Sequence, residues 1–214
     1  MKVNKLEYVI LDAMGVIYTA GDDVGELLIP FLRARGCCLS DKDIQTLYMD
    51  CSLGRMTSKE FWESSGILYE ETTDNEYILG HRLAPGLNEF LEAMADMNIR
   101  VACLSNDVSE WSVLLRKQHQ LEGHIEHWLI SGDLNARKPS EDIYKMMLEK
   151  LNTQPGSCLF LDDRMANLET AARLGIRTLL IDDPISTLND DNLTMKHQTA
   201  PSLEKALKLI RLML

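Results

Sequence analysis

The chain has 214 residues, of which 45% are hydrophobic and 26% are charged, and its formal net charge is −11. This length fits one domain, or one domain that carries an insertion, and the composition is that of a globular protein. The acidic balance argues against nucleic acid or an anionic membrane as the partner, and no apolar run reaches the length needed to span a bilayer. The five cysteines form no CxxC pair. We therefore expect reduced thiols and a cytoplasmic protein.

Five short apolar runs predict strands. Their hydrophobic residues are continuous rather than alternating, as in strands that are buried on both faces of a parallel sheet: Tyr8–Leu11, Val101–Leu104, His127–Ile130, Cys158–Leu161 and Thr178–Ile181. Amphipathic stretches predict helices at Leu87–Met97, Ser140–Leu151, Asn167–Leu174 and Ser202–Met213. This order predicts an α/β fold with a Rossmann-like parallel sheet and helices on both faces.

Residues 19–81 interrupt the alternation of strand and helix. They contain only helical patterns, at Glu26–Arg35, Asp41–Cys51 and Ser58–Ser65. Twelve acidic and five basic residues give this stretch a net charge of −7, most of the charge of the chain. We expect a small all-helical cap that is inserted after the first strand, with residues 1–18 and 82–214 forming the core.

Polar residues stand directly after the predicted strands. Asp12 follows the first strand, Ser105 and Asn106 follow the second, and Asp162 and Asp163 follow the fourth. Lys138 lies in the connection after the third strand, and Asn167 lies one helical turn beyond Asp163. Ligands of open parallel sheets bind beyond the carboxyl ends of the strands, so these residues are expected to meet at one edge. Three carboxylates in one place repel one another, and oxygen ligands indicate a hard cation such as Mg²⁺.

The four motifs, taken in order, resemble those of the haloacid dehalogenase-like (HAD) hydrolase superfamily. They are the Val9–Val16 stretch VILDAMGV, then Leu104–Asn106, then Lys138–Pro139, and then Leu161–Asp163 with Asn167. Within residues 19–81, Gly54–Thr57 followed by Glu60–Trp62 looks like the small cap of the branch that holds sugar-phosphate phosphatases and the N-terminal domain of soluble epoxide hydrolase.

The resemblance implies a Mg²⁺-dependent phosphatase that acts on a small phosphorylated metabolite through an aspartyl-phosphate. It implies a role for each motif residue. Asp12 would be the nucleophile and a metal ligand, with the Met14 carbonyl and Asp163 as further metal ligands. Ser105, the backbone of Asn106 and the catalytic Lys138 would bind the phosphoryl oxygens, and Asp162 with Asn167 would orient Lys138 or the waters of the metal. A monomer and a homodimer are both compatible with the sequence.

Met14 departs from the pattern of these phosphatases. They usually carry a second Asp at this position, which protonates the leaving oxygen and later activates water. Methionine transfers no proton, and such acid–base help is worth about 10²- to 10⁴-fold in rate. One explanation is that another group supplies the proton, with Asp22, Asp23, Tyr18 and the other acids of the cap as candidates.

Three further explanations remain open. The substrate could carry a good leaving group that needs little acid. The enzyme could cleave a different bond, C–halogen or P–C, and P–C cleavage would need a cap lysine such as Lys42 or Lys59. The protein could also be a non-catalytic or regulatory relative that keeps the metal and phosphate site for binding.

Overall fold

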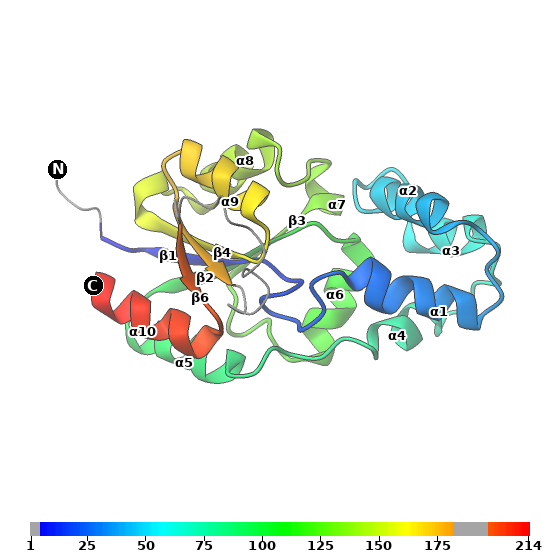
Figure 1. The fold of residues 1–214 in the computed structure, drawn as a ribbon, viewed down its shortest axis with the longest axis horizontal. Helices are drawn as coiled ribbons and strands as arrows, with labels where there is room; N and C mark the ends of the chain where they lie inside the picture. The colour runs from blue at the N-terminus through cyan, green and yellow to red at the C-terminus, as the bar shows by residue number, and fades with distance from the viewer. Residues whose placement is uncertain (1–4, 182–196) are drawn as a thin grey trace, which may run out of the picture.

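The computed structural model describes residues 5–181 and 197–214, and its centre is a six-stranded sheet (Figure 1). The strands follow one another across the sheet in the order β3-β2-β1-β4-β5-β6, and every neighbouring pair is parallel. Their bounds are β1 Tyr8–Leu11, β2 Arg100–Ser105, β3 His127–Ile130, β4 Cys158–Asp162, β5 Arg177–Ile181 and β6 Gln198–Ala200. Because β1 lies between β2 and β4, the strand order reverses there, which is where such sheets bind ligands.

Helices cover both faces of the sheet, as predicted (Figure 1). Tyr8 and Ile10 of β1 belong to a buried cluster with side chains of α8 and α9, whereas Val9 and Leu11 belong to the cluster of the opposite face. This alternation follows from the two-residue period of a strand. The core helices are α5 Leu87–Asp96, α6 Ser109–Gln118, α7 Ser131–Leu134, α8 Glu141–Leu151, α9 Met165–Arg173 and α10 Leu203–Met213, with a 3₁₀ turn at Pro155–Ser157.

Residues 19–81, called the helical segment below, lie beyond one end of the core in Figure 1. They contain a π-helix at Val24–Leu28 and the helices α1 Ile29–Ala34, α2 Asp41–Cys51, α3 Ser58–Ser64 and α4 Thr73–Ile78. The chain enters and leaves this segment side by side, because the Thr19 amide donates to the Arg82 carbonyl at 2.9 Å and the Ala84 amide to the Ile17 carbonyl at 2.8 Å.

The strands expected from the sequence are confirmed to within one residue at each end. The single helix expected at Glu26–Arg35 is wrong in detail. The Ile29 amide bonds the Val24 carbonyl, five residues earlier, and Pro30 has no amide proton with which to continue an α-helical ladder. The sequence reasoning also missed α4, α6, α7 and the short β6. No helix of the described residues has the length and apolar character that a membrane crossing requires.

Candidate active site

The centre of the site is a lysine between two carboxylates. Lys138 Nζ lies 2.7 Å from Asp12 Oδ1 and 2.8 Å from Asp162 Oδ2, and all three side chains are buried. Asp12 Oδ1 also accepts a hydrogen bond from the Ala13 amide at 2.6 Å. Both contacts fall on the same oxygen, so among the described residues Asp12 Oδ2 has no hydrogen-bond donor. Asp12 lines a cavity, and this oxygen is free of protein partners there.

Asp162 is held from three sides. Its carboxylate accepts from Asn167 Nδ2 at 2.9 and 3.0 Å and from the Arg164 amide at 2.8 Å, in addition to Lys138. Asn167 belongs to the first turn of α9, and its own carbonyl accepts from the Tyr144 hydroxyl of α8 at 2.9 Å. Asp162 and Asn167 therefore fix the position of the lysine ammonium.

Three carboxylates converge at this edge of the sheet. Asp12, Asp162 and Asp163 each place a carboxylate oxygen within 4.8 Å of the other two. Asp163 Oδ1 is buried and accepts no hydrogen bond from the described residues. The loop after β1 reaches Asp163 at Gly15, whose φ is +78° and where an added Cβ would collide with the Asp163 carboxylate. Glycine is thus required here both for the backbone conformation and for the close approach.

The charges of the cluster are unbalanced. Three carboxylates and one ammonium leave two negative charges. Burial raises the pKa of Asp12 well above its usual range, Lys138 opposes this effect, and Asp162 adds to it. Burial likewise raises the pKa of Asp163 to about 6. Burial alone would lower the pKa of Lys138, but the two carboxylates together raise it, so the lysine remains charged. The carboxylate oxygens and the excess of negative charge fit a hard divalent cation.

The end of β2 lies at the same site, where Ser105 is the last residue of the strand and Asn106, which follows it, lines the cavity. Ser105 is fully buried at the end of the strand, and its Oγ has no hydrogen-bond partner among the described residues. The Asn106 side chain donates from Nδ2 to the Lys138 carbonyl at 3.0 Å and accepts from the Lys138 amide at 2.8 Å. Its carboxamide is therefore committed to holding the Lys138 backbone, and the Ser105 hydroxyl, although it has no partner among the described residues, is not part of the cavity lining.

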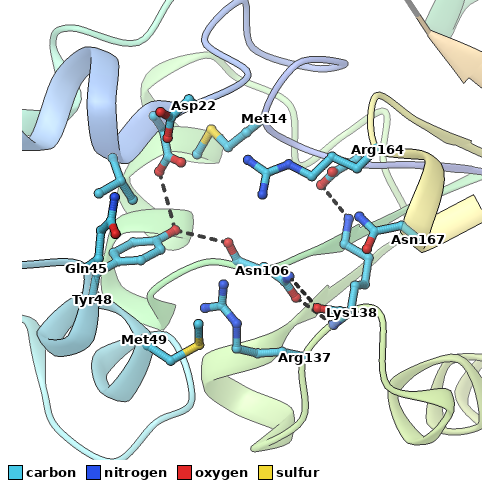
Figure 2. A pocket seen from close by; sticks show the side chains of 13 residues that line it. Met14, Asp22, Gln45, Tyr48, Met49, Asn106, Arg137, Lys138, Arg164 and Asn167 are labelled. Atoms are coloured by element: carbon cyan, nitrogen blue, oxygen red, sulfur yellow. Dashed lines mark hydrogen bonds and ion pairs between the residues drawn. The ribbon is translucent and has the colours of Figure 1, made fainter. Parts of the chain in front are cut away.

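Asp12, Asn106 and Lys138 line a cavity of about 240 Å³ (Figure 2). The core contributes Asp12, Met14, Asn106, Arg137, Lys138, Arg164 and Asn167, and the helical segment contributes Asp22, Asp23, Val24, Gln45, Tyr48 and Met49. The Tyr48 hydroxyl donates to the Asn106 carbonyl at 3.1 Å and lies 3.4 Å from Asp23 Oδ2. The helical segment thus closes the cavity by direct contact with the loop after β2.

The alternative proton donors named from the sequence are not equally placed. Asp22 and Asp23 line the cavity, and burial raises the pKa of Asp23 to about 6. Tyr18 does not line it; the ring is buried, centred 6.0 Å from His81 and 5.6 Å from His119.

Neither lysine considered for P–C cleavage lines the cavity. Lys42 is exposed on α2, and the exposed Lys59 lies 3.8 Å from Glu63.

Sequence reasoning missed two arginines and a tyrosine of the cavity. Arg137 and Arg164 stand next to Lys138 and Asp163 in the chain, and this adjacency to motif residues was a usable signal. Tyr48 had none, because nothing in a helical pattern indicates which face of α2 meets a loop 58 residues away.

Comparison with known proteins agrees with the geometry. A family model described as haloacid dehalogenase-like hydrolase matches residues 7–175. Bifunctional epoxide hydrolase 2 of Rattus norvegicus is 31% identical over 85 residues, which are 40% of this chain and 15% of the rat protein. Glyceraldehyde 3-phosphate phosphatase of Pyrococcus abyssi is 26% identical over 121 residues, 55% of this chain and 49% of that protein. The matches thus span at most about half the length of these two relatives.

A solved structure shares the fold. It is a HAD family enzyme of Bacteroides thetaiotaomicron in complex with magnesium and inorganic phosphate, with a TM-score of 0.67, 19% identity, and coverage of 83% of this chain and 94% of that one. At this identity the likeness concerns the fold alone. The family model, in contrast, covers well over half of the chain, and its match includes β1, β2 and β4 with the residues that follow them. The chain belongs to the haloacid dehalogenase-like hydrolases.

Proposed function

We propose that this protein is a Mg²⁺-dependent phosphatase of a small phosphorylated metabolite, with Asp12 as the nucleophile. The observation that carries the proposal is the contact of Lys138 with one oxygen of Asp12, which leaves the other oxygen free beside two further carboxylates. The phosphatase relative from Pyrococcus abyssi supports the substrate class, and the bacterial structure with magnesium and phosphate supports the cofactor.

The reaction has two displacements. Asp12 Oδ2 attacks phosphorus, the bond from phosphorus to the ester oxygen breaks, and the departing oxygen takes up a proton. Water then attacks the phosphorus of the aspartyl-phosphate, which releases inorganic phosphate and restores the Asp12 carboxylate. Lys138 neutralises charge on the phosphoryl oxygens as it develops, and Ser105 would donate a hydrogen bond to them. Asp162 and Asn167 keep Lys138 in place throughout.

Asp12, Asp163 and the carbonyl of Met14 would hold Mg²⁺. Their fit rests on the buried Asp163 Oδ1, which has no hydrogen-bond partner among the described residues, and on the excess of negative charge. When bound, the cation would balance this charge and lower the repulsion between the Asp12 carboxylate and the phosphoryl group.

In this proposal Asp23 supplies the proton that Met14 cannot. It is buried in the wall of the cavity, and a carboxyl group with a pKa near 6 can be protonated close to neutral pH. Asp23→Asn is expected to reduce turnover of an alkyl phosphate about 10²-fold or more. Acetyl phosphate has a leaving group that needs little acid, so its turnover is expected to change far less. Equal losses on both substrates at saturating Mg²⁺ would contradict an acid role.

We further propose that residues 19–81 act as a cap and that residues 1–18 and 82–214 form the core, where residues 1–4 and 182–196 lie outside the described part of the chain. The backbone hydrogen bonds that join the entry and exit of the segment, from Thr19 to Arg82 and from Ala84 to Ile17, support these boundaries. A cap that contributes half of the cavity wall would exclude water and select the substrate. The five free thiols suit a cytoplasmic setting, and the protein would act as a monomer or homodimer.

The test is phosphate release from small phosphomonoesters and acetyl phosphate, with and without Mg²⁺. Wild type is expected to turn over one or more of them with Mg²⁺ only, and Asp12→Asn is expected to abolish turnover. Asp96→Asn, a change at an exposed carboxylate of α5, serves as the control and should behave as wild type. Failure of wild type to release phosphate, together with retained Mg²⁺-dependent phosphate binding, would favour a regulatory relative instead.

A further inference from the structure

Two arginines occupy the cavity beside the proposed phosphoryl site. Arg137 directly precedes Lys138, and Arg164 directly follows Asp163. Both line the 240 Å³ cavity, and both also line an adjoining groove of about 600 Å³ that shares Asn106 and Lys138 with it. Figure 2 shows the two guanidinium groups pointing from different walls into the space around Asn106. They therefore lie where the inner cavity meets the outer groove.

Arg137 is a half-buried cation without a paired carboxylate among the described residues. Its guanidinium donates to Ser52 Oγ of the helical segment and lies 5.7 Å from the centre of the Tyr48 ring. Both partners are neutral, and they orient the group without neutralising it. An arginine carries five N–H donors in a planar fork that matches two oxygens of one anion. Among the described residues most of these donors remain unused, so they are available to an anion.

Arg164 is anchored at one end only. Its Nη2 donates to the Gly21 carbonyl at 2.9 Å, and its Nε lies 4.0 Å from Asp163 Oδ1, beyond hydrogen-bond distance. The side chain is 58% exposed. A carbonyl at the edge of the helical segment thus turns this guanidinium toward the cavity, and part of its fork stays free for a ligand.

No acidic residue of the cavity forms an ion pair with Arg137 among the described residues, although the charges of Asp23 and of nearby Asp107 oppose the lowering of its pKa by burial. In Figure 2, Asp22 lies beside Met14 on the wall opposite Arg137. Asp22 Oδ1 accepts from the Gly25 amide at 3.2 Å, and Asp23 is paired with the Tyr48 hydroxyl. These acids have local partners and do not ion-pair with Arg137. The lining of the groove contains three cations (Arg137, Lys138 and Arg164) and one carboxylate (Asp142), whereas the helical segment that closes the cavity has a net charge of −7.

We propose that Arg137 and Arg164 form an anion subsite that selects phosphomonoesters with a second anionic group, a carboxylate or another phosphate, at the end remote from the phosphoryl group. The proposal rests on the proposed function, because the phosphoryl group at Lys138 defines which end of the ligand reaches the arginines. Guanidinium groups bind carboxylate and phosphate in the same bidentate manner, so the geometry assigns the charge and leaves the choice between the two groups to experiment.

The test compares three ligands that share a three-carbon skeleton. Glycerol 3-phosphate has a neutral end, 3-phosphoglycerate replaces that end with a carboxylate, and glycerol 1,3-bisphosphate replaces it with a phosphate. Turnover is measured with Mg²⁺ as the ratio of kcat/KM to that of glycerol 3-phosphate. Binding is measured by calorimetry on Asp12→Asn, in which the esters stay intact. The variants are Arg137→Gln and Arg164→Gln, and the control is Arg55→Gln, which removes an exposed charge of the helical segment that pairs with Asp50.

Wild type is expected to prefer one of the two ligands with an anionic second end over glycerol 3-phosphate by about tenfold or more, the value of a charge-assisted hydrogen-bond pair. Each arginine variant should lower this ratio about tenfold, and Arg55→Gln should preserve it. Equal kcat/KM for all three ligands in wild type, or a ratio that neither arginine variant changes, would overturn the subsite and leave the phosphatase standing. Absence of any turnover would overturn the proposed function, while the calorimetric preference would still decide the subsite.

Discussion

Asp74 is the residue whose loss should most clearly loosen the helical segment. Its buried carboxylate accepts from the indole nitrogens of Trp62 and Trp111 at 2.7 and 2.6 Å and from the Ser58 hydroxyl at 2.9 Å. Trp62 and Ser58 belong to α3, whereas Trp111 belongs to core helix α6. A single side chain of α4 thus joins α3 to the core.

Asp74→Ala would leave two indole N–H groups buried without an acceptor. Each such group costs about 1–3 kcal/mol, so the two together cost about 2–6 kcal/mol. We therefore expect the free energy of unfolding to fall by about 2–6 kcal/mol. Asp74→Asn retains one acceptor oxygen for the indoles and should cost about 1–2 kcal/mol.

Urea unfolding followed by tryptophan fluorescence measures this loss, because two of the three tryptophans of the chain contact Asp74. Glu71→Ala, at an exposed acid in the preceding turn, is the matched control and should stay within about 0.5 kcal/mol of wild type. A loss below about 1 kcal/mol for Asp74→Ala would refute the reasoning, since it would mean that the indoles find other acceptors or reach water.

Two further predictions concern the metal site and the dependence of stability on pH. Gly15→Ala is expected to lower Mg²⁺ affinity tenfold or more in calorimetry, because the new Cβ would displace the Asp163 carboxylate. The control is Gly86→Ala, at a glycine with the same φ of +78° but no atom within 4 Å of the new Cβ. It introduces the same backbone strain without displacing Asp163 and should bind Mg²⁺ as wild type does. Burial lowers the pKa of His81 to about 4, so between pH 6.5 and 4 the unfolded chain binds a proton that the folded chain does not. Stability from this residue is thus full above pH 6.5 and falls by about 3 kcal/mol as the pH drops to 4. His81→Phe should flatten this part of the curve of unfolding free energy against pH, and an unchanged slope would show that other groups cause it.

The strands and the site edge could be predicted because each depends on short-range pattern. A strand that is buried on both faces requires an apolar residue at every position, so β1 and β4 appear as continuous runs. The acids that follow these strands reach one edge because parallel strands end together. Asp12, Asp162 and Asp163 consequently lie within 4.8 Å of one another, as their placement in the sequence indicated.

The missed features depend on contacts between distant segments. Tyr48 reaches Asn106 across 58 residues, and Asp74 reaches Trp111 across 37. Nothing in the local pattern of α2 or α4 distinguishes these side chains from other polar or aromatic residues of a helix. The short α4 and β6 could not be predicted from the sequence for a related reason. Their formation depends on packing against neighbours rather than on an amphipathic repeat of sufficient length.

Met14 and Asp23 together allow one further prediction, on the source of the proton. If Asp23 already serves as the acid, then Met14→Asp in the wild-type background adds a second acid to a step that is already assisted, and alkyl phosphate turnover should rise less than tenfold. In the Asp23→Asn background the same change restores an absent function, so turnover should rise about 10²-fold or more. The two changes are then strongly non-additive, which is the signature of residues that share one role. A rise of equal size in both backgrounds would show that Asp23 donates no proton. Asp23 would then not replace the acid that other phosphatases of the family carry at the position of Met14.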